Sequence, residues 1–139
     1  MAAPIYLADT SVYVLQARHP AVQRTFDSHL MAGRLAVCEM TAMEYLNNAP
    51  NPAIYETLWG ALQSQRWLKV TAEAMARALE IHRAMAAGSQ HRHFRLPDLI
   101  IAATAEVHGA TVLHYDVDYD RIAAITGQPT EWVAPRGSI

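Results

Sequence analysis

The sequence has little cysteine and no long apolar run, and each absence excludes a class of protein. Cys38 is the only cysteine, so no internal disulfide can form, which is typical of a reducing compartment. No apolar run approaches the roughly 20 residues that span a membrane. The first residues also lack the basic and apolar regions of a secretory signal. We therefore expect a cytoplasmic protein with no membrane segment.

Charge is also scarce and nearly balanced. Charged residues make up 17% of the chain, the net charge is −2, and Lys69 is the only lysine. A surface of this kind does not attract nucleic acid as a whole, so any such contact needs a local patch or a bound cation. The 139 residues are 52% hydrophobic, which suffices for a globular core. We expect one domain over residues 1–139.

Short apolar runs alternate with helical patterns along the chain. The runs predict strands at residues 4–8, 34–38, 67–70, 110–114 and 130–133. Apolar side chains at helical spacing predict helices near residues 12–15, 20–32, 42–46, 54–62, 72–87, 96–106 and 122–125. This alternation predicts an α/β fold, with helices on both faces of a mostly parallel sheet of four to five strands.

The helix predicted to begin near Leu96 is almost entirely apolar, yet an acidic residue stands at its start. From Leu99 to Ala105 the only polar side chain is Thr104, so protein must cover nearly every face of this helix. Asp98 precedes that segment. It either complements the helix dipole or forms part of a polar site.

Three further acidic residues occupy equivalent places. Asp9 and Asp116 follow predicted strands directly, and Glu44 lies in the first turn of the helix after the second strand. Each has a local explanation: Asp9 is a candidate helix cap, and Thr41 with Glu44 matches a capping box. However, the carboxyl ends of parallel strands and the starts of the following helices lie along one edge of a sheet. We therefore expect Asp9, Glu44, Asp98 and Asp116 to converge there.

Converging carboxylates predict a bound cation. Like charges at close range repel, and a hard divalent ion such as Mg²⁺ or Mn²⁺ relieves this because it prefers oxygen ligands. The usual purpose of such an ion is to activate water and to stabilise charge on a phosphodiester. His91 and His93 lie in a basic loop beside arginines, a context that does not favour zinc.

Four segments together resemble a PIN domain, and more narrowly a VapC-type toxin of a type II toxin–antitoxin module. They are residues 5–11, 41–44, 97–105 and 113–119, so the resemblance spans almost the whole chain. It implies a three-layer α/β/α fold and a Mg²⁺-dependent endoribonuclease that cleaves structured RNA, such as a tRNA or rRNA loop. It also implies a VapB-type antitoxin and a toxin homodimer.

The resemblance also implies a role for each site residue. Asp9 and Asp98 would bind the metal directly, and Glu44 and Asp116 would complete the catalytic acidic pocket. Asp118 occupies the second acidic position of an Asp-x-Asp-aromatic motif, so either Asp116 or Asp118 would lie closer to the metal. The hydroxyl groups of Thr10 and Ser11 would assist metal-bound water or phosphate.

The loop at residues 90–95 is the candidate substrate contact. Arg92 and Arg95 would hold RNA phosphates and Phe94 would stack on a base. The alternative is a solvated basic loop that does neither.

Other functions fit parts of the pattern. A phospho-acceptor receiver domain also gathers acids at strand ends, but it needs a lysine near the phosphoryl group. Lys69 lies at the end of the third predicted strand, before the later acidic motifs, and this position does not favour a receiver domain. A non-catalytic module could accept a basic peptide in the same acidic pocket. A nuclease acting on DNA is a further alternative, because nothing in the sequence visibly recognises a 2′-hydroxyl.

Overall fold

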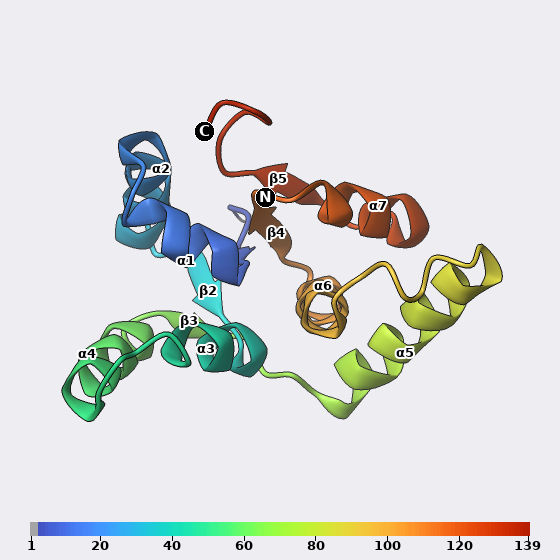
Figure 1. Cartoon of the computed structure of the whole chain (residues 1–139), viewed down its shortest axis with the longest axis horizontal. Coiled ribbons are helices and arrows are strands. Elements are labelled where there is room, and N and C mark those ends of the chain that lie inside the picture. The colour runs from blue at the N-terminus through green and yellow to red at the C-terminus, as the bar shows by residue number, and fades with distance from the viewer. Residues whose placement is uncertain (1–2) are drawn as a thin grey trace.

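The computed structural model describes residues 3–139, which form five strands and seven helices (Figure 1). The strands are β1 (Tyr6–Ala8), β2 (Leu35–Val37), β3 (Arg66–Trp67), β4 (Thr111–His114) and β5 (Thr130–Trp132). The helices are α1 (Thr10–Gln16), α2 (Pro20–Met31), α3 (Glu39–Leu46), α4 (Pro52–Gln63), α5 (Ala72–Ala87), α6 (Leu96–His108) and α7 (Val117–Thr126). The predicted alternation of strands and helices is confirmed.

Within residues 3–139, the strands form one sheet in the order β3-β2-β1-β4-β5, and every pair of neighbours is parallel. The central strand β1 pairs with β2 on one side and with β4 on the other. The chain therefore builds the sheet outward in one direction from β1 and then returns to extend it in the other. Open sheets of this kind place their sites where the strand order reverses, at the carboxyl ends of the strands.

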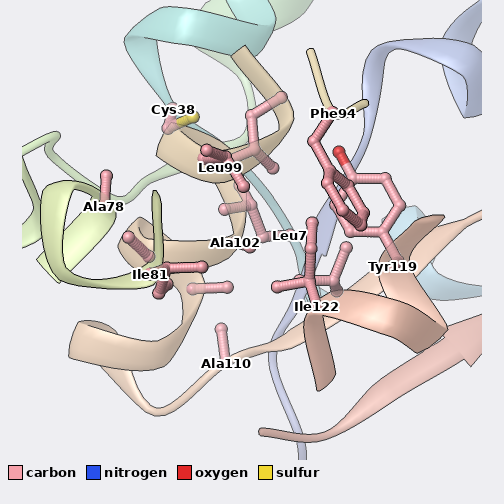
Figure 2. Close-up of a cluster of buried hydrophobic side chains, with 14 of the residues drawn as sticks. Leu7, Cys38, Ala78, Ile81, Phe94, Leu99, Ala102, Ala110, Tyr119 and Ile122 are labelled. Atoms are coloured by element: carbon pink, nitrogen blue, oxygen red, sulfur yellow. The ribbon is translucent and has the colours of Figure 1, made fainter. Parts of the chain in front are cut away.

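Helices cover both faces of the sheet, so the fold has three layers. Leu7, Ala36 and Val112 point to one face and pack in a cluster with residues of α5, α6 and α7 (Figure 2). Their neighbours Ala8 and Leu113 point to the other face and pack in a second cluster with residues of α1, α2, α3 and α4. Figure 1 shows α1, α2 and α4 on one side of the sheet and α5 and α7 on the other. The alternation of side chains along each strand produces this division.

Helix α6 is as buried as its sequence predicts. Every residue from Ile101 to Ala105 is buried, and Leu99 lies in the same core. Pro97 lies in the first turn, where its missing N–H leaves no hydrogen bond unmade. Gly109 ends the helix in the left-handed conformation, with φ of 69°. Among residues 3–139, no helix has both the length and the apolar character that crossing a bilayer requires.

The predicted capping box at Thr41 is wrong. Helix α3 begins at Glu39, two residues earlier, with Cys38 in the capping position. Thr41 therefore lies inside the helix, fully buried, and its hydroxyl group is 3.6 Å from the Cys38 sulfur. The earlier start leaves the Glu44 carboxylate free of any capping role.

The third strand is shorter than predicted. It ends at Trp67 instead of at residue 70, although the N–H of Leu68 still donates to the Val37 carbonyl at 2.9 Å. The N–H of Val70 instead donates to the Glu39 carboxylate at 2.9 Å, which turns the chain away from the sheet.

Candidate active site

A cavity of about 620 Å³ opens at the carboxyl edge of the sheet, beside the central strand. Its walls come from segments far apart in the sequence: α1, the C-terminal end of α3, the start of α6 and the loop after β4. The four acidic side chains Asp9, Glu44, Asp98 and Asp116 all line it. The expected convergence of these side chains is therefore present, and we call this cavity the acidic pocket.

Asp9 is held at both carboxylate oxygens. It follows β1 directly and caps α1. Its Oδ2 atom accepts hydrogen bonds from the Ser11 hydroxyl group at 2.7 Å and from the Ser11 N–H at 3.3 Å. Its Oδ1 atom accepts a hydrogen bond of 2.8 Å from the Tyr119 hydroxyl group. The buried carboxylate is therefore fixed in orientation by two elements, α1 and α7.

Asp98 lies beside Asp9 and is only 3% exposed. Its Oδ1 atom is 3.4 Å from the same Tyr119 hydroxyl group, so one hydroxyl lies within reach of both carboxyl groups. Burial and then the charge of Asp9 raise the pKa of Asp98 from 3.8 to about 7, although Arg95 opposes the shift. Asp98 thus keeps its proton to a higher pH than an ordinary aspartate does.

Glu44 accepts hydrogen bonds from both sides of the acidic pocket. The Thr10 hydroxyl group donates to its Oε1 atom at 2.8 Å, and Arg95 Nη2 donates to its Oε2 atom at 2.6 Å. The Arg95 side chain is 67% exposed, so it reaches the carboxylate from the solvent side. Helix α3 therefore presents Glu44 to the pocket.

Asp116 and Asp118 face different surroundings. Asp116 lines the acidic pocket and caps α7 by accepting from the Asp118 N–H at 2.9 Å. The Asp118 carboxylate instead accepts from Arg121 Nη1 at 3.0 Å and lies 3.6 Å from His93 Nε2. Of the two acids that could lie near the metal, Asp116 is at the pocket wall and Asp118 is in an ion pair with Arg121 outside that wall.

The candidate substrate residues are only partly brought together. Thr10, Ser11 and Arg95 line the acidic pocket, whereas Arg92 is exposed and is not part of its wall. Phe94 is 8% exposed and packs in the core cluster of Figure 2. The hypothesis that Phe94 stacks on a base is therefore wrong, because its ring is buried inside the protein.

Sequence reasoning missed Tyr119 as part of the site. This residue is a fully buried aromatic on α7, and apolar spacing predicts only that its ring packs in the core. The direction of its hydroxyl group depends on how α7 docks against β1 and α6, which no local pattern encodes. Tyr119 contacts the site through its hydroxyl group, whereas Asn47, Asn48 and Tyr115 line the acidic pocket itself, without any signal in the sequence.

The acidic pocket fits a hard divalent cation held by few protein ligands. Among residues 3–139, no three His, Cys, Asp or Glu side chains lie close enough together to hold a metal ion. Asp9 and Asp98 form the close pair, and their mutual repulsion is the kind that a cation relieves. Mg²⁺ is typically bound by one or two carboxylates and keeps several waters. The residues present thus fit Mg²⁺ or Mn²⁺, which Asp9 and Asp98 would hold.

Comparison with known proteins places the chain in a family. The family model described as PIN domain matches residues 6–125. Ribonuclease VapC18 of Mycobacterium tuberculosis (strain ATCC 25618 / H37Rv) is 41% identical over 137 residues, covering 97% of this chain and 99% of that protein. Ribonuclease VapC51 of the same strain is 44% identical over 134 residues, covering 96% of each chain.

Solved structures share the fold at low identity. A chain of the DNA-bound VapBC structure from Salmonella typhimurium matches with a TM-score of 0.77 and 16% identity, covering 95% of this chain and all of that one. A chain of the VapBC2 structure from Rickettsia felis, bound to a promoter DNA fragment, matches with a TM-score of 0.74 and 14% identity, covering 92% and 98%. The chain therefore belongs to the PIN-domain family, among relatives that carry the VapC name.

Proposed function

We propose that this protein is a metal-dependent endoribonuclease of the VapC type, and that the acidic pocket is its active site. The observation that carries the proposal is the pair of buried carboxyl groups, Asp9 and Asp98, within reach of one hydroxyl group and with the pKa of Asp98 raised to about 7. Relatives 41% and 44% identical over nearly the whole chain are named ribonucleases.

Each side chain of the acidic pocket has a role in this proposal. Bound Mg²⁺ or Mn²⁺ would activate water and stabilise charge on the phosphodiester. Asp9 and Asp98 would hold the ion. Asp116, at the pocket wall, would accept a hydrogen bond from water near it. Glu44 would hold the hydroxyl group of Thr10 and the guanidinium of Arg95 in place until substrate arrives.

Arg95 supplies the positive charge that an RNA phosphate needs in this acidic surrounding. It is exposed, it borders the acidic pocket, and planar guanidinium groups suit phosphate oxygens. The hydroxyl groups of Thr10 and Ser11 lie at the same site. Substrate would therefore meet Arg95 first and the carboxylates behind it.

Cleavage of matched nucleic acids tests the proposed substrate class. Structured RNA, such as tRNA or an rRNA stem-loop, and DNA of the same sequence should be incubated with the protein in Mg²⁺ and in EDTA. We expect cuts in the RNA that require the cation. Cleavage of DNA alone would instead indicate a DNA nuclease, and cleavage of neither would favour a binding module that accepts a basic peptide.

We further propose that a VapB-type antitoxin neutralises the protein. The family resemblance supports this partner, and the fold is shared with chains solved within VapBC structures. Co-expression with a candidate antitoxin should suppress the RNA cleavage measured above. Persistence of full cleavage in the presence of a bound antitoxin would contradict this part of the proposal.

A homodimer is the second proposed assembly. An apolar groove of about 290 Å³ between α5 and α6 is lined by side chains that include Met75, Leu79 and Leu96. Leu79 is 69% exposed and Leu96 is 60% exposed, and covering such side chains is favourable. Sedimentation velocity should show a dimer that Leu79→Glu converts to monomer, whereas a monomeric wild-type protein would exclude this assembly.

A further inference from the structure

The Tyr119 hydroxyl group lies between the two carboxyl groups that the proposed function assigns to the metal. Tyr119 is 0% exposed. Its hydroxyl oxygen is 2.8 Å from Asp9 Oδ1 and 3.4 Å from Asp98 Oδ1. A tyrosine hydroxyl carries one hydrogen to donate, and the shorter distance assigns that hydrogen to Asp9. Asp9 and Asp98 thus approach each other around a single neutral donor.

The ring that carries this hydroxyl group is rigidly held. Figure 2 shows it within the core cluster that also contains Phe94 and Ile122. The His114 imidazole packs against the ring, with 5.0 Å between the ring centres. His114 Nδ1 in turn accepts a hydrogen bond of 3.2 Å from the Asp116 backbone N–H. Core packing therefore sets the position of the hydroxyl group. Through His114, the ring is also linked to the backbone of Asp116.

The remaining contacts of Asp9 show what the hydroxyl group adds. Both donors on Asp9 Oδ2 come from Ser11, two residues away in the first turn of the helix that Asp9 caps. Tyr119 is 110 residues from Asp9 in the sequence and is the donor on Oδ1. Without it, Ser11 alone would hold the carboxylate, which could then turn about its Cα–Cβ and Cβ–Cγ bonds.

We propose that Tyr119 is a positioning residue, whose hydroxyl group fixes the Asp9 carboxylate beside Asp98 in the orientation that binds a divalent cation. This inference rests on the proposed function, because it takes Asp9 and Asp98 to be the metal ligands. Tyr119 touches neither substrate nor reacting atoms and acts through Asp9. Outer-shell donors of this kind typically change metal affinity by about 10- to 100-fold when they are removed.

Tyr119→Phe tests the inference because it removes the hydroxyl group and keeps the buried ring. Mn²⁺ binding should be measured by titration calorimetry on the full chain without RNA. We expect the dissociation constant for Mn²⁺ to rise by about 10-fold, the lower end of the outer-shell range. Thermal unfolding in EDTA should be recorded in parallel to establish that each variant is folded at the temperature of the titration.

Tyr13→Phe is the matched control. Tyr13 is also buried, but its hydroxyl group donates a hydrogen bond of 2.7 Å to Gln65, a residue outside the acidic pocket. Both variants lose one hydrogen bond of a buried tyrosine, so both are expected to lose some thermal stability. Only Tyr119→Phe should lose Mn²⁺ affinity.

The outcomes separate this inference from the proposed function. Equal Mn²⁺ affinity in the wild type and in Tyr119→Phe would overturn the positioning role and leave the metal-nuclease proposal intact. Equal losses of affinity in Tyr119→Phe and Tyr13→Phe would also overturn it, because the effect would then follow from stability alone. A wild-type protein that binds no Mn²⁺ or Mg²⁺ would overturn the proposed function itself, and the inference with it.

Discussion

The guanidinium of Arg95 and the carboxylate of Glu44, 51 residues apart in the sequence, pair across the rim of the acidic pocket at 2.6 Å. The Arg95 side chain is mostly exposed, and exposed ion pairs of this kind contribute little to stability. The pair can therefore open at small cost, which would leave Arg95 available for a phosphate of the proposed RNA substrate. The contact brings a positive charge to an otherwise acidic site.

Arg95→Ala should weaken RNA binding more than it slows cleavage of bound RNA. We expect KM to rise and the slope of log KM against log salt concentration to fall by about 0.7, the change for one lost phosphate contact on a single strand. Cleavage kinetics at several salt concentrations measure both quantities. Because the Arg95 pair is exposed, thermal stability should change little.

Arg92→Ala is the comparison for Arg95→Ala. Arg92 lies in the same loop region and is exposed, but it is not part of the acidic pocket. We expect a smaller effect on KM than in Arg95→Ala. If the double variant Arg92→Ala with Arg95→Ala cleaves RNA with unchanged salt dependence, neither residue holds phosphate.

Asp116→Asn and Asp118→Asn should differ in activity. Asp116 lines the acidic pocket, so loss of its charge should lower RNA cleavage by about 10-fold or more, as for other residues that support a metal site. Asparagine also caps helices well, so α7 should remain folded. Asp118→Asn removes the contacts of this carboxylate with Arg121 and His93, which lie outside the acidic pocket, and should leave cleavage nearly unchanged. The opposite ranking would identify Asp118 as the functional acid.

The contribution of Asp98 to the stability of the metal-free protein should fall as the pH rises through neutrality. The pKa of Asp98 is raised from 3.8 to about 7, so the folded protein binds a proton that the unfolded chain has released. The stability from this proton is fully present below the unfolded value and is lost as the pH rises through about 7. Raising the pH from 6.5 to 8 in EDTA should therefore change the melting temperature less favourably in the wild type than in Asp98→Asn, and this difference isolates Asp98 from the histidines whose pKa values are lowered by burial.

Added Mg²⁺ provides the complementary measurement. The cation should raise the melting temperature of the wild type near pH 8, because binding to the folded state alone stabilises it. Asp98→Asn should show little of this effect. An equal pH dependence in the wild type and in Asp98→Asn would indicate that the Asp98 carboxyl group does not titrate in this range.

The sequence predicts the fold well because its strongest patterns are also the most buried ones. The apolar stretch of α6 and the short apolar strands leave little choice of where each element packs. The order of the elements also predicts that Asp9 and Asp116, which follow strands, and Asp98, in the first turn of α6, meet at one edge of the sheet. Glu44 reaches the same pocket from the C-terminal half of α3 and not from its first turn as predicted, because this helix begins at Glu39.

The sequence does not predict where individual side chains point, and the errors and omissions arise there. Thr41 matches a capping box, but the helix starts two residues earlier, and burial of Thr41 beside Cys38 replaces the cap. Phe94 lies in a polar loop, and only the packing of that loop against the core buries its ring. The link from Tyr119 to Asp9 spans 110 residues and depends on how separate helices dock.

RNA cleavage by Asp9→Asn and Asp98→Asn tests whether the acidic pocket is the active site. Each variant should be compared with the wild type in Mg²⁺, at equal concentration and after thermal unfolding has established that it is folded. If the acidic pocket is the active site, each substitution lowers the cleavage rate by more than about 100-fold, beyond the loss typical of outer-shell residues. If both variants are folded and cleave RNA at the wild-type rate, the acidic pocket is not the active site.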